Sequence, residues 1–155
     1  YAAGDCAEFK DVVFGRQHIM GNWANATSQG NAIGRTMSGD KTVFETTSSY
    51  SINFFDGSCS FIGVTDEKFA DEVVSRGSVE GGKMTRIFVK KYEGKSRLNP
   101  DLGVQPLKGM RIVGATVINS LADVSPLTSA VKGKIDVSKH MDKLGDLSFD
   151  LRNVL

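Results

Sequence analysis

The sequence predicts a mainly β or α+β fold, with an antiparallel sheet or small barrel and one or two short helices. Three observations favour it. Glycine is common and proline rare, at 17 and 3 residues. Runs of alternating apolar and polar residues recur along the chain, and strand and helix patterns do not alternate regularly. The length of 155 residues suits one domain over 1–155 with a buried core.

The clearest strands flank the Asp-Gly pair at 56–57, within "SSYSINFFDGSCSFIGV". Asp-Gly between alternating runs is a strong hairpin signal. A two-residue loop there would pair Phe54 with Cys59 and Ile52 with Phe61. One face of the hairpin would then be apolar and the other rich in serine. We therefore expect the apolar face to point into the core and to carry the Cys59 thiol with it.

The other elements are predicted from periodicity and capping signals. The best helix covers about 66–76, because Thr65 is a good N-cap and acidic residues follow in the first turn. Residues 21–41 contain four glycines and no sustained period, which predicts a loop or irregular strand. Further strands are expected at 83–92, at 110–121 as a central strand, at 130–137 and at 146–155, with one or two helical turns at 138–145.

The first residues and the two cysteines bear on location. "YAAGDC" at 1–6 contains small residues like those around a signal-peptidase site, which predicts an extracytoplasmic protein, periplasmic or secreted. In such a protein Cys6 and Cys59 would form a disulfide, worth about 4 kcal/mol on a chain-entropy estimate. In a cytosolic protein they would be separate buried thiols. A core position for Cys59 argues against a nucleophile.

Motifs that carry chemistry are incomplete in this chain. The segment "GSVEGGKM" at 77–84 approaches a phosphate-binding loop, but Met84 replaces the required hydroxyl and a helix is expected before it rather than after. The two histidines, His18 and His140, lie far apart, and the chain has no C-x-x-C or H-E-x-x-H motif. The sequence therefore predicts no catalytic residue, no metal site and no cofactor.

Charge is unevenly distributed. Residues 83–111 carry 8 basic and 2 acidic side chains, which predicts a positive surface for an acidic protein, a glycan or a lipid headgroup. Two aromatic residues in the segment are too few for base stacking, so nucleic acid is disfavoured. Two alternatives stay open: a solvated edge that blocks aggregation, or pairing with the acidic segment 65–76. The candidate partner surface consists of Lys83, Arg86, Lys90, Lys91, Lys95 and Arg97.

The triplet Gly21-Asn22-Trp23 resembles the G-x-W that begins the first strand of lipocalin-type barrels. This resemblance implies a barrel whose cavity binds a small apolar ligand, with Trp23 packed at the closed end. The alternative is that Gly21 is part of a turn and Trp23 is a core aromatic residue.

Three hypotheses for function follow. The first is a non-catalytic, extracytoplasmic binding or interaction module on a β-rich scaffold. The second is a carrier of a small apolar ligand, as the lipocalin resemblance implies. The third is an enzyme whose catalytic residues are dispersed along the sequence. The absence of every compact catalytic motif favours the first. No run of about 20 apolar residues is present, so no transmembrane segment is expected.

Overall fold

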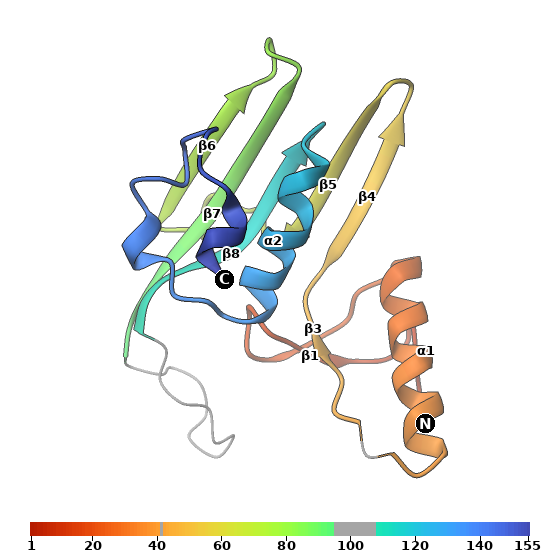
Figure 1. The fold of residues 1–155 in the computed structure, drawn as a ribbon. Coiled ribbons are helices and arrows are strands. Elements are labelled where there is room, and N and C mark those ends of the chain that lie inside the picture. The colour runs from red at the N-terminus through yellow and green to blue at the C-terminus, as the bar shows by residue number, and fades with distance from the viewer. Residues whose placement is uncertain (41, 95–107) are drawn as a thin grey trace.

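A five-stranded antiparallel sheet dominates the structure, a computed structural model that describes residues 1–40, 42–94 and 108–155 (Figure 1). Its strand order is β4-β5-β8-β7-β6. The strands are β4 (Ser49–Phe54), β5 (Gly57–Gly63), β6 (Glu72–Ser78), β7 (Lys83–Glu93) and β8 (Lys108–Ile118). The sequence correctly predicts β7, and it predicts β8 as a long central strand.

A smaller sheet is formed by β1 (Phe9–Asp11), β2 (Gln17–His18) and β3 (Glu45–Thr46). Strand β1 pairs antiparallel with β2 and parallel with β3. Two α-helices, α1 (Trp23–Met37) and α2 (Leu121–Lys132), and two short 3-10 helices, η2 (Ser138–His140) and η3 (Leu151–Val154), complete the described chain. The predicted fold class is confirmed as mainly β with two helices, and the described strands form open sheets rather than a barrel.

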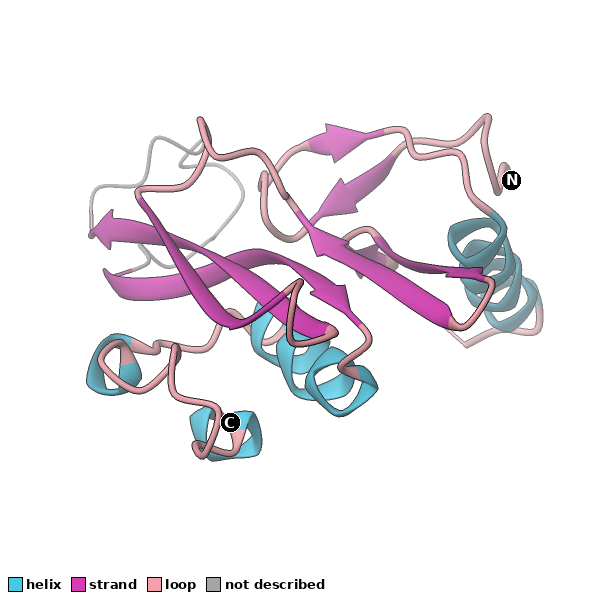
Figure 2. Cartoon of the chain, turned by 90° about the horizontal axis from the view of Figure 1, so that it is seen from above, coloured by secondary structure: helices cyan, strands magenta, loops and turns pink. Residues whose placement is uncertain are grey.

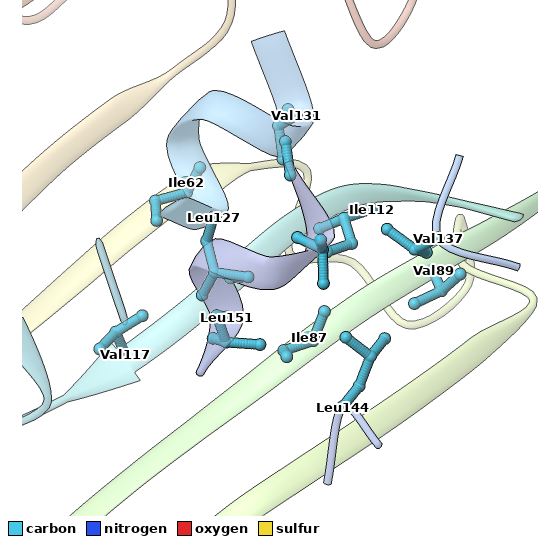
Figure 3. Packing of buried hydrophobic residues seen from close by; sticks show 13 residues of the cluster. Ile62, Ile87, Val89, Ile112, Val117, Leu127, Val131, Val137, Leu144 and Leu151 are labelled. Atoms are coloured by element: carbon cyan, nitrogen blue, oxygen red, sulfur yellow. The ribbon is translucent and has the colours of Figure 1, made fainter. Parts of the chain in front are cut away.

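The core lies between the large sheet and α2. Figure 3 shows side chains of the sheet, α2 and the C-terminal segment meeting in one cluster. Seen from above, α2 and the short helices lie on one side of the large sheet, and the small sheet lies on the other (Figure 2). The largest side chains buried in this cluster are Ile62, Ile87, Val89, Ile112, Val117, Leu127, Val131, Val137, Leu144 and Leu151.

The β4–β5 hairpin forms, but its apolar face does not enter this core. Strand register pairs Ile52 with Cys59 and Tyr50 with Phe61, so the loop lies one residue earlier than predicted while the same residues share a face. The serine face is the covered one: Ser60 is 1% exposed, whereas Ile52 is 50% exposed. The expectation that Cys59 points into the core is therefore wrong.

The physical reason lies at the far end of β5. Ile62, on the serine face, is fully buried beneath α2 and fixes which side of the hairpin is covered. The hydroxyl groups of Ser51 and Ser60 hydrogen-bond each other at 2.7 Å, so the buried Ser60 hydroxyl has a partner. The apolar face that carries Tyr50, Ile52 and Phe54 stays about half exposed.

The helix predicted at 66–76 is also wrong. Asp66 caps only a short turn, in which its carbonyl accepts from the amide of Phe69 at 3.0 Å. From Glu72 onward the chain is strand β6, which pairs with β7 over seven residues. The β-branched Val73 and Val74 suit this pairing, and the ladder with β7 outweighs the capping signal.

Three further expectations are corrected. Residues 21–41, predicted as a loop, contain α1, and the strand predicted at 130–137 is replaced by the end of α2. The strand predicted at 146–155 is replaced by turns and η3, whose start is capped by Asp150. The alternation of Leu147, Phe149 and Leu151 does not produce a strand because the segment packs as a cover on the core.

Candidate functional site

The first turn of α1 is the centre of the candidate site. Asn22 is the N-cap, with extended backbone angles, and its side chain accepts from the amide of Asn25 at 2.8 Å. This cap is why a helix begins in a segment whose glycines predict a loop. The first turn carries no acidic residue, so the partial positive charge of the helix N-terminus is not offset from within the helix.

A tight turn near the chain start lies against this helix. Gly4 has φ +83° and would bring a Cβ to 3.5 Å from the Cβ of Ala26. Its amide donates to Oε1 of Gln29 at 2.8 Å, in a buried position. The next residue, Asp5, places its carboxylate beside Gly21, where a Cβ would lie 3.3 Å from Oδ2. Gly4 and Gly21 therefore permit the close approach of Asp5 to the start of α1.

The Asp5 carboxylate is exposed and forms neither a hydrogen bond nor an ion pair with any residue that the structure describes. Two buried amide groups next to it are also incomplete: Oδ1 of Asn25 and Nε2 of Gln29 lack hydrogen-bond partners. Buried polar atoms are nearly always paired in folded proteins. The start of α1 thus combines an exposed carboxylate with two buried amide side chains that are each incompletely hydrogen-bonded.

Trp23 is the first residue of α1, and 83% of its surface is exposed. The lipocalin resemblance is therefore misleading, because Trp23 begins a helix rather than a strand and does not close a barrel. An exposed indole ring can pack against a flat, partly apolar molecule. The alternative of a core aromatic at this position is also wrong.

A pocket of about 340 Å³ runs along the inner flank of α1, between the helix and the small sheet. Phe9, Ile33 and Phe44 supply apolar walls, and Gln29 lies in its lining. The ion pair between Lys10 and Glu45, at 2.8 Å, is at its edge. The underside of α1 is thus less completely packed than the underside of α2.

The basic residues predicted as a partner surface do not form one open patch. Arg86 pairs with Glu67 at 2.6 Å, Lys90 lies 3.7 Å from Asp71, and Lys91 lies 3.6 Å from Glu93. Glu67 and Asp71 belong to the acidic segment 65–76, and pairing with that segment was one of the alternatives left open by the sequence. Lys83 has no carboxylate partner among the described residues. Lys95 and Arg97 lie outside the described residues.

The two cysteines do not form the expected disulfide. Both are free, with Cys6 exposed and Cys59 partly exposed. Burial raises the pKa of the Cys59 thiol, so it is held in the protonated form and is a poor nucleophile. Cys6 lies in the turn after Asp5, whereas Cys59 lies on the large sheet, and the two elements are on separate parts of the fold.

No group of three or more His, Cys, Asp or Glu side chains in residues 1–40, 42–94 and 108–155 is placed to hold a metal ion. None of the helices in these ranges is both long and apolar enough to cross a bilayer.

Known protein structures share this fold. The chain is similar to part of the covalent putidaredoxin reductase–putidaredoxin complex, with a TM-score of 0.74, 18% identity, and coverage of 99% of this chain and 31% of the other. No protein-family profile and no curated protein sequence matches it.

Two further structures match over nearly the whole chain. A ferredoxin reductase from Rhodopseudomonas palustris gives a TM-score of 0.68, 24% identity, and coverage of 98% of this chain and 32% of the other. An FAD-dependent pyridine nucleotide-disulphide oxidoreductase from Desulfovibrio vulgaris gives a TM-score of 0.69 at 18% identity, with coverage of 99% of this chain and 37% of the other. The chain thus spans about a third of the length of the solved proteins it matches.

These matches correct the functional hypothesis. A non-catalytic binding module was expected, but the fold is that of a part of oxidoreductases. The same finding overturns the class of secreted or periplasmic binding protein. A location outside the cytoplasm stays a prediction that rests on the first residues alone.

The sequence analysis missed Asp5 and Asn22 as site residues. Its motif tests looked for short patterns, whereas this site joins two short segments about 16 residues apart. A usable signal existed: Asn22 is a good N-cap residue, and a helix start placed there would have drawn attention to the Gly4-Asp5 turn. That the turn packs against the helix is visible only in the fold.

Proposed function

We propose that this chain forms part of the flavin site of an electron-transferring oxidoreductase, with the start of α1 and Asp5 as its contribution. The observation that carries the proposal is the free Asp5 carboxylate beside the N-terminus of α1, in a fold shared with an FAD-dependent oxidoreductase and with ferredoxin reductase. Oxidoreductase activity of the whole enzyme is part of this proposal, because a shared fold alone does not establish an activity.

The residues present fit flavin adenine dinucleotide. The cofactor carries a chain of hydroxyl groups, two phosphates and a flat ring system. Asp5 can accept from a hydroxyl group, since its oxygens have no other partner in the described chain. The unpaired amide groups of Asn25 and Gln29 offer an acceptor and a donor nearby. The lack of side chains at Gly4 and Gly21 permits Asp5 to approach the start of α1 closely.

The N-terminus of α1 would act electrostatically. Its free backbone amides and helix dipole favour negative charge. A bound flavin supplies the redox chemistry, because its ring system takes up electrons and passes them on. The Asp5 carboxylate lies beside this helix start and would be stabilised there by the positive field. Trp23 would shield one side of the site from water.

The experiment uses Trp23, the only tryptophan, as a probe. Titration of the purified chain with FAD should quench its emission in a saturable way. Asp5→Asn should raise the apparent Kd at least fivefold, since an amide oxygen replaces a charged acceptor. Asp142→Asn, at an exposed position far from α1, is the matched control and should bind as the wild type. Equal affinity of Asp5→Asn and wild type would refute the role of Asp5.

The partner is proposed to be a redox protein, because one structural match is a reductase in covalent complex with putidaredoxin. The exposed Trp23 and the half-exposed apolar face of β4 supply surface for such a contact. An acidic protein, a glycan or a lipid headgroup at the basic segment stays a weaker proposal, since Arg86, Lys90 and Lys91 are already paired within the chain.

A further inference from the structure

A second pocket, of about 330 Å³, lies where the β6–β7 hairpin meets the start of α2. Strand β8 leads into α2 at the end of the sheet where β7 begins, because Met84 pairs with Ile118 (Figure 1). The polar lining comes from Arg76, Ser78, Lys83 and Ser120. This pocket belongs to the large sheet and shares no residue with the start of α1.

Arg76 is the unusual member of the lining, because it is a charged residue that is only 5% exposed. Its Nη2 donates to the carbonyl of Phe149 at 3.1 Å. Oδ2 of Asp123 lies 3.6 Å from Nε, close enough for an ion pair but not for a hydrogen bond. Nε and Nη1 are buried without a hydrogen-bond partner. Burying a guanidinium group costs free energy when some of its N–H donors have no acceptor, and a bound acceptor would remove that cost.

The other groups around the pocket are also donors. Ser120 precedes α2 but makes no side-chain cap, so the first amides of this twelve-residue helix are free of such a partner. The hydroxyl of Ser78 accepts from the amide of Gly81 at 3.0 Å and keeps its own hydrogen to donate. Lys83 is exposed, and no carboxylate of the described residues lies within ion-pair distance of it.

The charge balance leaves room for an anion. Asp123 faces Arg76 and offsets its charge. The pKa of Asp146 is lowered mainly by hydrogen bonds from Ser148. The positive charge of the Arg76 guanidinium lowers it further, by a smaller amount. Glu80 lies in the same hairpin turn and does not pair with Lys83. Asp123 also lies in the first turn of α2 and partly offsets the helix N-terminus. The charge of Lys83 is therefore the one left without a carboxylate partner on the pocket side.

We propose that this pocket binds a phosphate group, held by Lys83, the first backbone amides of α2 and the hydroxyl of Ser78, with the unpaired donors of Arg76 in its lining. Phosphate fits better than carboxylate because donors converge from a strand, a hairpin turn and a helix N-terminus rather than in one plane. The group is either inorganic phosphate or the terminal phosphate of a small ester. The site is independent of the flavin proposal.

The test is an NMR titration of the ¹⁵N-labelled chain with sodium phosphate at pH 7, against sodium chloride at equal ionic strength. The amide signals of Gly81, Ser120 and Leu121 should move saturably with phosphate and not with chloride. Shifts that stay linear, or that spread evenly over the surface lysines, would overturn the proposal. So would acetate binding as tightly as phosphate, because the site would then recognise charge and not the phosphate group.

Two variants make the test specific. Lys83→Gln removes the free charge at an exposed position and should weaken phosphate binding at least fivefold without affecting folding. Lys139→Gln, an exposed lysine on η2, is the matched control and should bind phosphate as the wild type does. Unchanged affinity in Lys83→Gln would overturn the site.

Ribose 5-phosphate, with ribose as its control, distinguishes the two sources of the group. Binding at least tenfold tighter than that of inorganic phosphate would assign the site to a phosphate ester. Equal or weaker binding of the ester would assign it to inorganic phosphate. Binding of ribose alone at comparable strength would contradict recognition of the phosphate.

Discussion

Helices α1 and α2 bury opposite kinds of residue. The buried residues of α1 are the amides Asn25 and Gln29. Those of α2 include Leu127, Ala130 and Val131, each at most 2% exposed. Helix α1 starts with a side-chain cap from Asn22, whereas α2 starts without one. One helix is held mainly by hydrogen bonds at its N-terminal end, and the other by apolar packing along its length.

The difference separates stability from function in this fold. Most helical stability in proteins comes from packing an apolar face, which α2 provides for the large sheet. Helix α1 instead exposes Trp23 and leaves buried amide atoms without partners. We infer that the buried face of α1 leaves space for a ligand, whereas the buried face of α2 serves the core. Four substitution experiments sharpen this contrast.

The largest effect is expected in α2. Leu127→Ala should lower the free energy of unfolding by about 2–5 kcal/mol, because it removes a fully buried side chain and leaves a cavity. Ile33→Ala in α1, which lines the open pocket, should cost clearly less. Urea unfolding followed by circular dichroism measures both. Equal losses would mean that α1 is as firmly packed as α2 and would remove the contrast.

The next effect compares two glycines of the α1 region. Gly4→Ala should destabilise the chain by about 1–2 kcal/mol, since φ is +83° and the left-handed conformation is costly for alanine. Gly30→Ala, in the helix with no atom within 4 Å of a new Cβ, should stabilise it by about 0.5–1 kcal/mol. Melting temperatures that shift in the same direction for both variants would contradict the turn geometry.

A smaller effect is expected at the helix starts. Asn22→Ala should cost about 1 kcal/mol because it removes the hydrogen bond to the amide of Asn25. Ser120→Ala should cost less, since Ser120 caps no backbone amide of α2 and donates only to Oδ2 of Asp123, at 3.1 Å. Chemical unfolding of the two variants side by side gives the comparison. A larger loss for Ser120→Ala would reverse the assignment of the caps.

The smallest effect is a pH dependence of stability at Asp150, the residue that caps η3. Hydrogen bonds from the Arg152 side chain and amide lower the pKa of Asp150 to about 2. Its unfolded pKa is about 3.9, so its contribution to stability is present above that value and is lost as the pH falls towards 2. Thermal melting of wild type and Asp150→Asn should differ at pH 6 and converge near pH 2. A gap that widens on acidification would contradict this sign.

Local alternation was sufficient to predict β7, β8 and the hairpin residues that share a face. It could not predict which face of the hairpin is covered, because that depends on Ile62 meeting α2. It failed at 66–76, where a good cap at Thr65 was outweighed by pairing of β6 with β7. Asp5 was missed because its role depends on contact with Gly21, which no local pattern encodes.

Strand β4 has a consequence for handling the purified chain. It is the outer strand of the large sheet, and its sequence, SYSINF, contains no charged residue and no proline. Edge strands in soluble proteins usually carry such residues to prevent strand addition between molecules. With the apolar rings of Tyr50 and Phe54 beside that edge, concentrated solutions should self-associate through added strands. Ile52→Lys should reduce this self-association, because a charged side chain on the edge strand opposes strand addition between molecules.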